Sequence, residues 1–227
     1  GPNKEMKKLR EFYKDGFYHV FNRGVNKEVI FREKADFVFY LYKIKDLLNK
    51  FPASIHAYSL MPNHFHQLPQ QISEKPLSSF YQSIHTSLGN FLNRKYGRVG
   101  PIFQGRPQAK VIEKDDYLLT LSFYINLNII LEELQHQNYP KISSSRLDKL
   151  LIKAENYPWG SYGVYLGLRE DGITNDKFIL SIISDDIQKA RKEYRKMAKD
   201  ILISKKFLKL RDLIFEDDMG SDPGLTP

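Results

Sequence analysis

Two kinds of hydrophobic pattern alternate along the first 135 residues of the chain. Short runs of β-forming residues predict strands, whereas apolar residues that recur every three or four positions predict helices. In chain order, these patterns predict a strand over 17–24, a helix over 34–51, strands over 54–61 and 64–70, a helix over 76–97, a loop and short strand within 98–113, and a helix over 116–134. This order predicts an α+β fold, in which helices pack on one face of an antiparallel sheet.

The C-terminal third of the chain has a different character. An aromatic segment at 157–168 is typical of an ordered loop, and the basic segment 187–211 is amphipathic, which predicts a helix. We expect four parts: an N-terminal arm over 1–14 that begins with a tag-removal remnant, Gly1-Pro2; a main domain over 15–170; a basic helical appendage over 171–214; and an acidic, disordered tail over 215–227.

Composition narrows the class of partner. The chain has a net charge of +8 and is 13% aromatic, which suits nucleic acid because Lys and Arg neutralise phosphates and rings stack on bases. Basic proteins without a nucleic-acid partner also exist, so charge alone leaves both readings open. The absence of cysteine excludes disulfides, thiol nucleophiles and cysteine zinc sites, and fits a reducing cytoplasm. The sequence contains no run of about 18 apolar residues, so we expect no membrane-spanning helix.

The segment MPNHFHQ, residues 61–67, carries the first candidate chemistry. His64 and His66 are two residues apart on a predicted strand, so their side chains project from one face. Two imidazoles on one face can bind a metal ion, which would act as a Lewis acid on a substrate phosphate. Two ligands are too few for a closed site, however, and solvated histidines explain the same spacing.

The helix predicted over 116–134 adds a nucleophile and a further ligand. Tyr124 and Asn128 are four residues apart, which puts them on one helical face. A phenol is a poor nucleophile at its free pKa of about 10, and a metal that polarises the phosphate lowers the demand on it. An amide oxygen, such as that of Asn128, suits Mg²⁺ or Mn²⁺. Tyr117 is the rival nucleophile, and a core aromatic and a surface amide are the plainer interpretations.

Four motifs together resemble one family. MPNHFH, FLNRKYGRVGPIFQGR, DDYLLTLSFYINLN and YPWGSY occur here in an order and spacing similar to those of the HUH-type single-tyrosine transposases, especially the REP-associated tyrosine transposases. The resemblance covers about residues 15–168 and implies the ferredoxin-like (RRM-like) HUH fold for that part of the chain.

The resemblance also implies roles for individual residues. His64, His66 and Asn128 correspond to the metal ligands, for Mg²⁺ or Mn²⁺, and Tyr124 to the nucleophile. The implied reaction is cleavage and joining of single-stranded DNA beside a palindromic hairpin, through a 5′-phosphotyrosine and a free 3′-hydroxyl. The implied setting is a bacterial cytoplasm, at the nucleoid. Such proteins occur as monomers and as dimers, and we expect a monomer.

Basic residues in two regions are candidates for DNA contact. In the main domain, three arginines and a lysine stand near predicted strand ends and loops: Arg23, Arg98, Arg106 and Lys110. In the basic segment 187–211, four residues are candidates for a clamp on hairpin phosphates: Lys192, Arg195, Lys196 and Lys199. Solvated surface positions explain each of them equally well.

The chain departs from the family pattern at several positions. QLPQQ follows the second histidine where the family has apolar residues, Pro107 replaces an aromatic residue, and Asn126 and Ile129 replace a histidine and a proline. Because Pro69 lacks an N–H, it predicts a strand that lies at a sheet edge or ends early. The departures motivate an alternative, a hairpin-binding protein that has lost cutting. A hydrolase that activates water at the metal is a third hypothesis.

Overall fold

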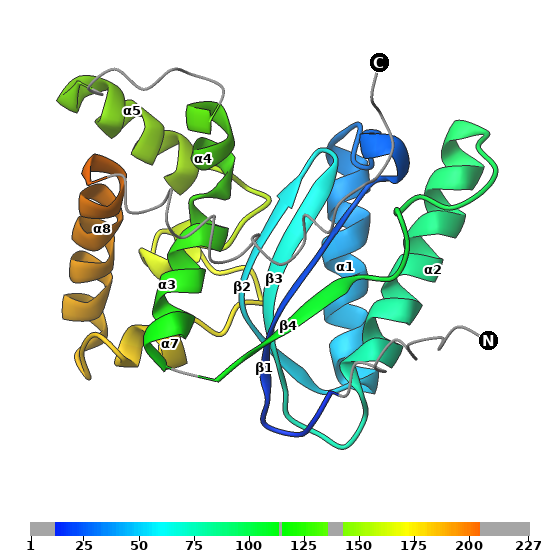
Figure 1. The fold of residues 1–227 in the computed structure, drawn as a ribbon, viewed down its shortest axis with the longest axis horizontal. Coiled ribbons are helices and arrows are strands. Elements are labelled where there is room, and N and C mark those ends of the chain that lie inside the picture. Colours follow the sequence, from blue (N-terminus) through cyan, green and yellow to red (C-terminus); the bar gives the residue numbers. More distant parts are fainter. Residues whose placement is uncertain (1–11, 114, 136–142, 205–227) are drawn as a thin grey trace, which may run out of the picture. The chain divides into compact units, whose positions relative to one another are not determined.

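A computed structural model describes residues 12–113, 115–135 and 143–204. The strands are β1 (Phe17–Arg23), β2 (Ala53–Met61), β3 (His64–Gln71) and β4 (Gln108–Ile112). The helices are η1 (Val25–Lys27), α1 (Lys34–Lys50), α2 (Leu77–Tyr96), α3 (Asp115–Asn126), α4 (Asn128–Gln135), α5 (Ser144–Glu155), α6 (Tyr162–Tyr165), α7 (Lys177–Ser181) and α8 (Ile187–Ile203) (Figure 1). The predicted α+β class is confirmed, and most of the expected bounds of its strands and helices hold to within two residues.

The four strands form one sheet in the order β2-β3-β1-β4. β1 and β4 are antiparallel, with Phe17 opposite Ile112 and Phe21 opposite Gln108. The two-residue Pro62-Asn63 turn joins β2 to β3, and a turn this short can connect only antiparallel neighbours. The sheet thus brings β1, early in the chain, between two strands that come later.

Pro69 does not have the effect that we expected. β3 continues through Pro69 to Gln71 and lies between β2 and β1, so it is neither an edge strand nor shortened. Pairing is maintained just past the proline, because the Asp15 N–H donates to the Gln71 carbonyl at 2.6 Å and the Gln71 N–H donates to the Gly16 carbonyl at 3.0 Å. The proline removes one ladder donor, and the two bonds of Gln71 keep the strand paired beyond it.

Contacts within the chain divide the described residues into two compact units. The first contains 12–54, 62–64 and 69–113, and the second contains 55–61, 65–68, 115–135 and 143–204. In the first unit α1 and α2 lie side by side (Figure 1), and the rings of Phe39 and Phe91 stack at 4.0 Å between them.

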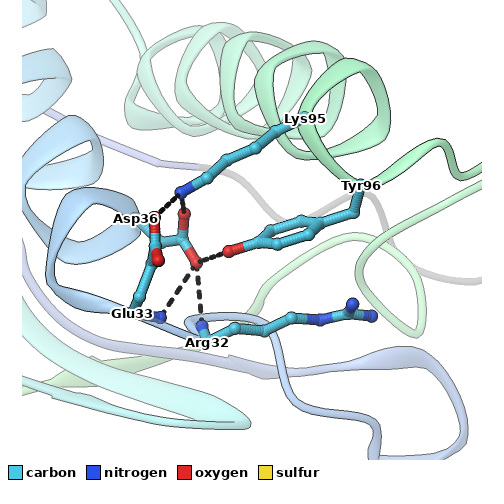
Figure 2. Close-up of polar contacts among 5 residues, drawn as sticks. All are labelled: Arg32, Glu33, Asp36, Lys95 and Tyr96. Atoms are coloured by element: carbon cyan, nitrogen blue, oxygen red, sulfur yellow. Dashed lines mark hydrogen bonds and ion pairs between the residues drawn. The ribbon is translucent and has the colours of Figure 1, made fainter.

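A polar cluster ties the start of α1 to the end of α2 (Figure 2). The Asp36 carboxylate is fully buried and accepts from Lys95 Nζ at 2.5 Å, from Tyr96 Oη at 2.7 Å, and from two backbone N–H groups, those of Arg32 and Glu33. Glu33 and Asp36 also form a capping box, which satisfies N–H groups that the first helical turn leaves open. The cluster therefore fixes where α1 begins and where α2 ends.

Substitutions of two glycines in the first unit are expected to have opposite effects on stability. A Cβ at Gly24 would lie 2.2 Å from the Glu28 carbonyl oxygen, whereas one at Gly89, inside α2, would find Ile102 at 3.8 Å. We expect Gly24→Ala to lower the free energy of unfolding by about 1–3 kcal/mol through backbone displacement. Gly89→Ala is expected to raise it by about 0.5–1 kcal/mol, because alanine is the better helix former.

Urea unfolding of the two glycine variants beside the unmodified chain checks this pair. Equal effects of Gly24→Ala and Gly89→Ala would contradict the close approach of the Glu28 carbonyl to Gly24.

The second unit covers the outer edge of β2 with irregular chain. Leu60 N–H donates to the Trp159 carbonyl at 2.8 Å, and Ser161 N–H donates to the Tyr58 carbonyl at 2.9 Å. The aromatic segment 157–168 is therefore ordered, and it includes the short helix α6. Covering an edge strand in this way prevents its open backbone groups from pairing with another chain.

The basic segment begins with α8, which packs against α5 and α7. Its buried face consists of Ala190, Tyr194, Ala198 and Leu202, which confirms that the helix is amphipathic. Asp186 caps the helix by accepting from Gln188 N–H at 2.9 Å. The predicted tail, 215–227, and residues 1–11 of the predicted arm lie outside the described residues.

Candidate functional site

Both histidines of the MPNHFH motif lie on β3, in line with the strand prediction. Because they are two residues apart, they project from one face of the strand. His64 is partly exposed, and its Nδ1 lies 2.8 Å from Asn63 Oδ1. His66 is 3% exposed. An imidazole whose one nitrogen is held by a neighbouring amide has a fixed orientation, which is a feature of histidines that bind metals.

Tyr124 of α3 contacts His66 directly. Their ring centroids are 5.4 Å apart and the rings are almost perpendicular, at 84°, which is an edge-to-face arrangement. Tyr124 is itself buried, at 3% exposure. The fold thus places the family-implied nucleophile against one of the family-implied metal ligands, although the two are far apart in the sequence.

The helix that we expected over 116–134 is two helices. α3 ends at Asn126 and α4 begins at Asn128, with Leu127 between them. Leu127 N–H still donates to the Phe123 carbonyl at 2.9 Å, while both Ile130 and Leu131 donate to the Leu127 carbonyl. The break follows Asn126, whose side chain bonds to the side chains of Tyr194 and Ser161.

The break changes the geometry argued for Tyr124 and Asn128. Tyr124 occupies the last turn of α3 and Asn128 the first position of α4, so uninterrupted helical spacing does not relate them. Asn128 is 2% exposed and is therefore not the surface amide of the plainer interpretation. The metal-binding role of Asn128 stays a prediction.

The metal-binding roles of His64, His66 and Asn128 stay predictions. Among residues 12–113, 115–135 and 143–204, no three or more His, Asp or Glu side chains are grouped to hold a metal ion. Mg²⁺ or Mn²⁺ on His64, His66 and Asn128 would need further oxygens, from water or from a substrate phosphate. Such a site is the open kind that catalysis requires.

The rival nucleophile Tyr117 lies on α3 as well and is partly exposed. Burial raises the pKa of its phenol above the ordinary value, which disfavours the phenolate. The ring of Tyr124 contacts the ring of His66, at 5.4 Å between centroids. The choice of Tyr124 over Tyr117 as the nucleophile stays a prediction.

The basic candidates of the main domain lie along β1, β4 and the loop before β4. Arg23 ends β1, and its Nε donates to Gln104 Oε1. Arg98 pairs with Glu28 at 2.8 Å, whereas Arg106 is exposed. Lys110 stands opposite His19 in the β1–β4 register, and burial together with the Lys110 charge lowers the pKa of His19 to about 3. DNA contact by these residues stays a prediction.

Three of the four basic candidates on α8 form ion pairs. Arg195 contacts Glu155 at 2.6 Å, Lys199 contacts Asp148 at 2.9 Å, and Lys196 lies 3.6 Å from Glu193, while Lys192 is exposed. Two of these pairs join α8 to α5. This arrangement suits a packed helix at least as well as a phosphate clamp, and the clamp stays a prediction.

Sequence reasoning missed the polar residues on the back of α3. Ser122 and Asn126 are both buried, and both bond to the Tyr194 hydroxyl of α8 at 2.9 Å. A signal existed, because two polar residues four apart in an otherwise apolar helix share a face and require buried partners.

No helix in the described parts of the chain is long and apolar enough to cross a membrane.

No family model matches the chain, and no curated protein sequence matches it. Among solved structures, a REP-associated tyrosine transposase bound to a REP hairpin matches with a TM-score of 0.53 and 16% identity, over 75% of this chain and 93% of that chain. Identity this low bears on fold and not on activity. The chain therefore has the α+β fold of a REP-associated tyrosine transposase.

Proposed function

We propose that the chain is a metal-dependent endonuclease and strand transferase that acts on single-stranded DNA beside a hairpin. The observation that carries the proposal is the contact of Tyr124 with His66, at 5.4 Å between ring centroids. A phenol and an imidazole held together at the end of α3 fit nucleophilic attack on a phosphate near a metal. The fold match and the basic charge of the chain support DNA as the substrate.

The proposed reaction is a transesterification at phosphorus. The Tyr124 oxygen forms a bond to the scissile phosphate, the bond from phosphorus to the 3′-oxygen breaks, and the phenolic proton ends on that 3′-oxygen. One product is a 5′-phosphotyrosine and the other a free 3′-hydroxyl. A second 3′-hydroxyl can reverse the step and join two strands, because one phosphodiester replaces another. Mg²⁺ or Mn²⁺ would neutralise charge on the phosphate, with His64, His66 and Asn128 as its protein ligands.

Burial of the nucleophile favours a second candidate function. Tyr124 is 3% exposed, so a DNA phosphate can reach it only if the surrounding side chains move. A protein that binds hairpins and no longer cuts them would keep the same fold and charge. It would bind hairpin DNA in a salt-sensitive way and form no adduct.

End-labelled DNA distinguishes the two functions. A hairpin with a single-stranded flank is labelled at its 5′ or its 3′ end, incubated with Mg²⁺, Mn²⁺ or EDTA, and resolved on a denaturing gel. We expect the 3′ label to migrate with the protein and the 5′ label to appear in a shorter free strand, in both cases only with metal. Salt-sensitive binding without adduct would support the hairpin-binding candidate, and a 5′ label on the protein would contradict the proposed polarity.

A further inference from the structure

The Tyr194 hydroxyl of α8 is the centre of a directed hydrogen-bond chain behind α3. Ser122 Oγ donates its hydrogen to the Leu119 carbonyl at 2.6 Å, so it can only accept from Tyr194 Oη, 2.9 Å away. Tyr194 therefore donates to Ser122, and its oxygen accepts from Asn126 Nδ2 at 2.9 Å.

The other end of Asn126 extends the chain of bonds to the sheet. Ser161 Oγ has two acceptors within reach, Asn126 Oδ1 at 2.6 Å and the Tyr58 carbonyl at 3.2 Å, and the shorter contact assigns its hydrogen to Asn126. Ser161 Oγ accepts from the Tyr58 backbone N–H at 2.9 Å. Tyr58 belongs to β2 and Ser161 precedes α6. The amide orientation of Asn126 is thus fixed from both sides, and bonds that run in one direction polarise and strengthen one another.

The geometry of α3 places this network opposite the nucleophile. Ser122 and Asn126 are four residues apart and share a helical face. Tyr124 is two residues from each of them, a rotation of about 200° about the helix axis, so it projects from the other side. That side contacts His66. The helix is therefore held from behind while its front presents Tyr124.

The Tyr194 ring is packed against other aromatic rings. It is fully buried, stacks on Phe123 at 4.1 Å and lies 4.7 Å from the Tyr165 ring. Burial raises the pKa of the Tyr194 phenol far above its ordinary value, so the hydroxyl keeps its proton. Tyr194 needs this proton in order to donate to Ser122.

We infer that Tyr194 is a positioning residue, through which α8 sets the last turn of α3 and hence the orientation of the Tyr124 oxygen. The inference rests on the proposed nucleophilic role of Tyr124. It gives α8 a function at the reaction site without any contact to DNA. A small misplacement of a reacting atom lowers the rate while leaving substrate binding intact, which separates this role from a purely structural one.

Tyr194→Phe tests the inference, because it removes only the hydroxyl. The matched control is Tyr165→Phe, which also removes a buried hydroxyl from the same ring cluster, one that donates to the His56 carbonyl at 2.8 Å and not to α3. At saturating hairpin DNA, we expect the single-turnover adduct rate to fall roughly 10-fold in Tyr194→Phe and less than about 2-fold in Tyr165→Phe. Hairpin affinity should change less than about 2-fold in both.

Equal adduct rates in the two variants would overturn the inference, as would a rate loss explained by weaker binding. If Tyr194→Phe does not fold, Ser122→Ala takes its place, with an expected loss of roughly 3-fold. Hydrogen exchange over residues 122–128 gives a readout independent of activity, and we expect it to be faster in Tyr194→Phe than in Tyr165→Phe. If the unmodified chain forms no adduct, the proposed function fails, and equal exchange in the two variants would then overturn the positioning role.

Discussion

Tyr124→Phe is expected to abolish the covalent protein–DNA adduct, with a loss of more than about 1,000-fold in its rate of formation. The substitution removes the oxygen that would bond to phosphorus. It keeps the ring, so the edge-to-face contact with His66 at 5.4 Å can persist. Hairpin affinity should therefore be unchanged, which separates the loss of chemistry from a loss of binding.

The matched control is Tyr117→Phe, on the same helix. Adduct formation should continue in this variant. The measurement is the denaturing gel with 3′-labelled hairpin DNA and Mn²⁺, with hairpin affinity determined in parallel. An undiminished adduct in Tyr124→Phe would refute the assigned nucleophile, and its loss in Tyr117→Phe would move the role to that residue. Strand cutting that survives without Tyr124 would instead favour a hydrolase that activates water.

Asp36→Asn is expected to lower the free energy of unfolding by about 2–4 kcal/mol at neutral pH. All the groups that contact the buried Asp36 carboxylate are donors: Lys95 Nζ, Tyr96 Oη and the N–H groups of Arg32 and Glu33 (Figure 2). An amide must turn its own NH₂ group toward some of them, which leaves donors facing donors. Asp46, whose pair with Lys43 is exposed on the same helix, supplies the control, and Asp46→Asn should cost less than about 0.5 kcal/mol.

The effect of Asp36→Asn should also depend on pH. Burial opposes ionisation of Asp36, but hydrogen bonds from Lys95, Tyr96 and two backbone N–H groups outweigh it and hold the pKa of this carboxyl below its usual value. Its contribution is then complete above the unfolded pKa of about 3.9 and is lost as the pH falls through the lower folded pKa.

Urea unfolding at pH 7 and at pH 3 measures this dependence. The stability difference between the unmodified chain and Asp36→Asn should narrow at the lower pH, while the small difference for Asp46→Asn should stay nearly constant. A difference that widens on acidification would contradict the lowered pKa of Asp36.

Local sequence signals were sufficient for most of the secondary structure. The Pro62-Asn63 turn marked the boundary between β2 and β3, and Gly97 caps α2 in the left-handed conformation, with φ of 62°. Alternating and helical periodicities set the elements between these points. Such signals act within a few residues, so they can be read from the chain alone.

The signals failed where distant residues decide the outcome. The effect of Pro69 depends on the strands that flank β3. One of them is β1, which lies far earlier in the chain. The break between α3 and α4 coincides with the bonds of Asn126 to Tyr194 and Ser161, two residues that follow it at long range. The residue pattern of the helix itself carries no information about these partners.

By itself, the sequence determined the α+β class, the strand that carries both histidines and the helix that carries Tyr124. The tertiary structure alone decided that Tyr124 contacts His66, that Asn128 begins a separate helix, and that Tyr194 holds α3 from behind. The physical reason is the range of the forces involved. Backbone propensity and side-chain period are local, whereas the position of a buried polar group is set by whichever distant donors and acceptors satisfy it.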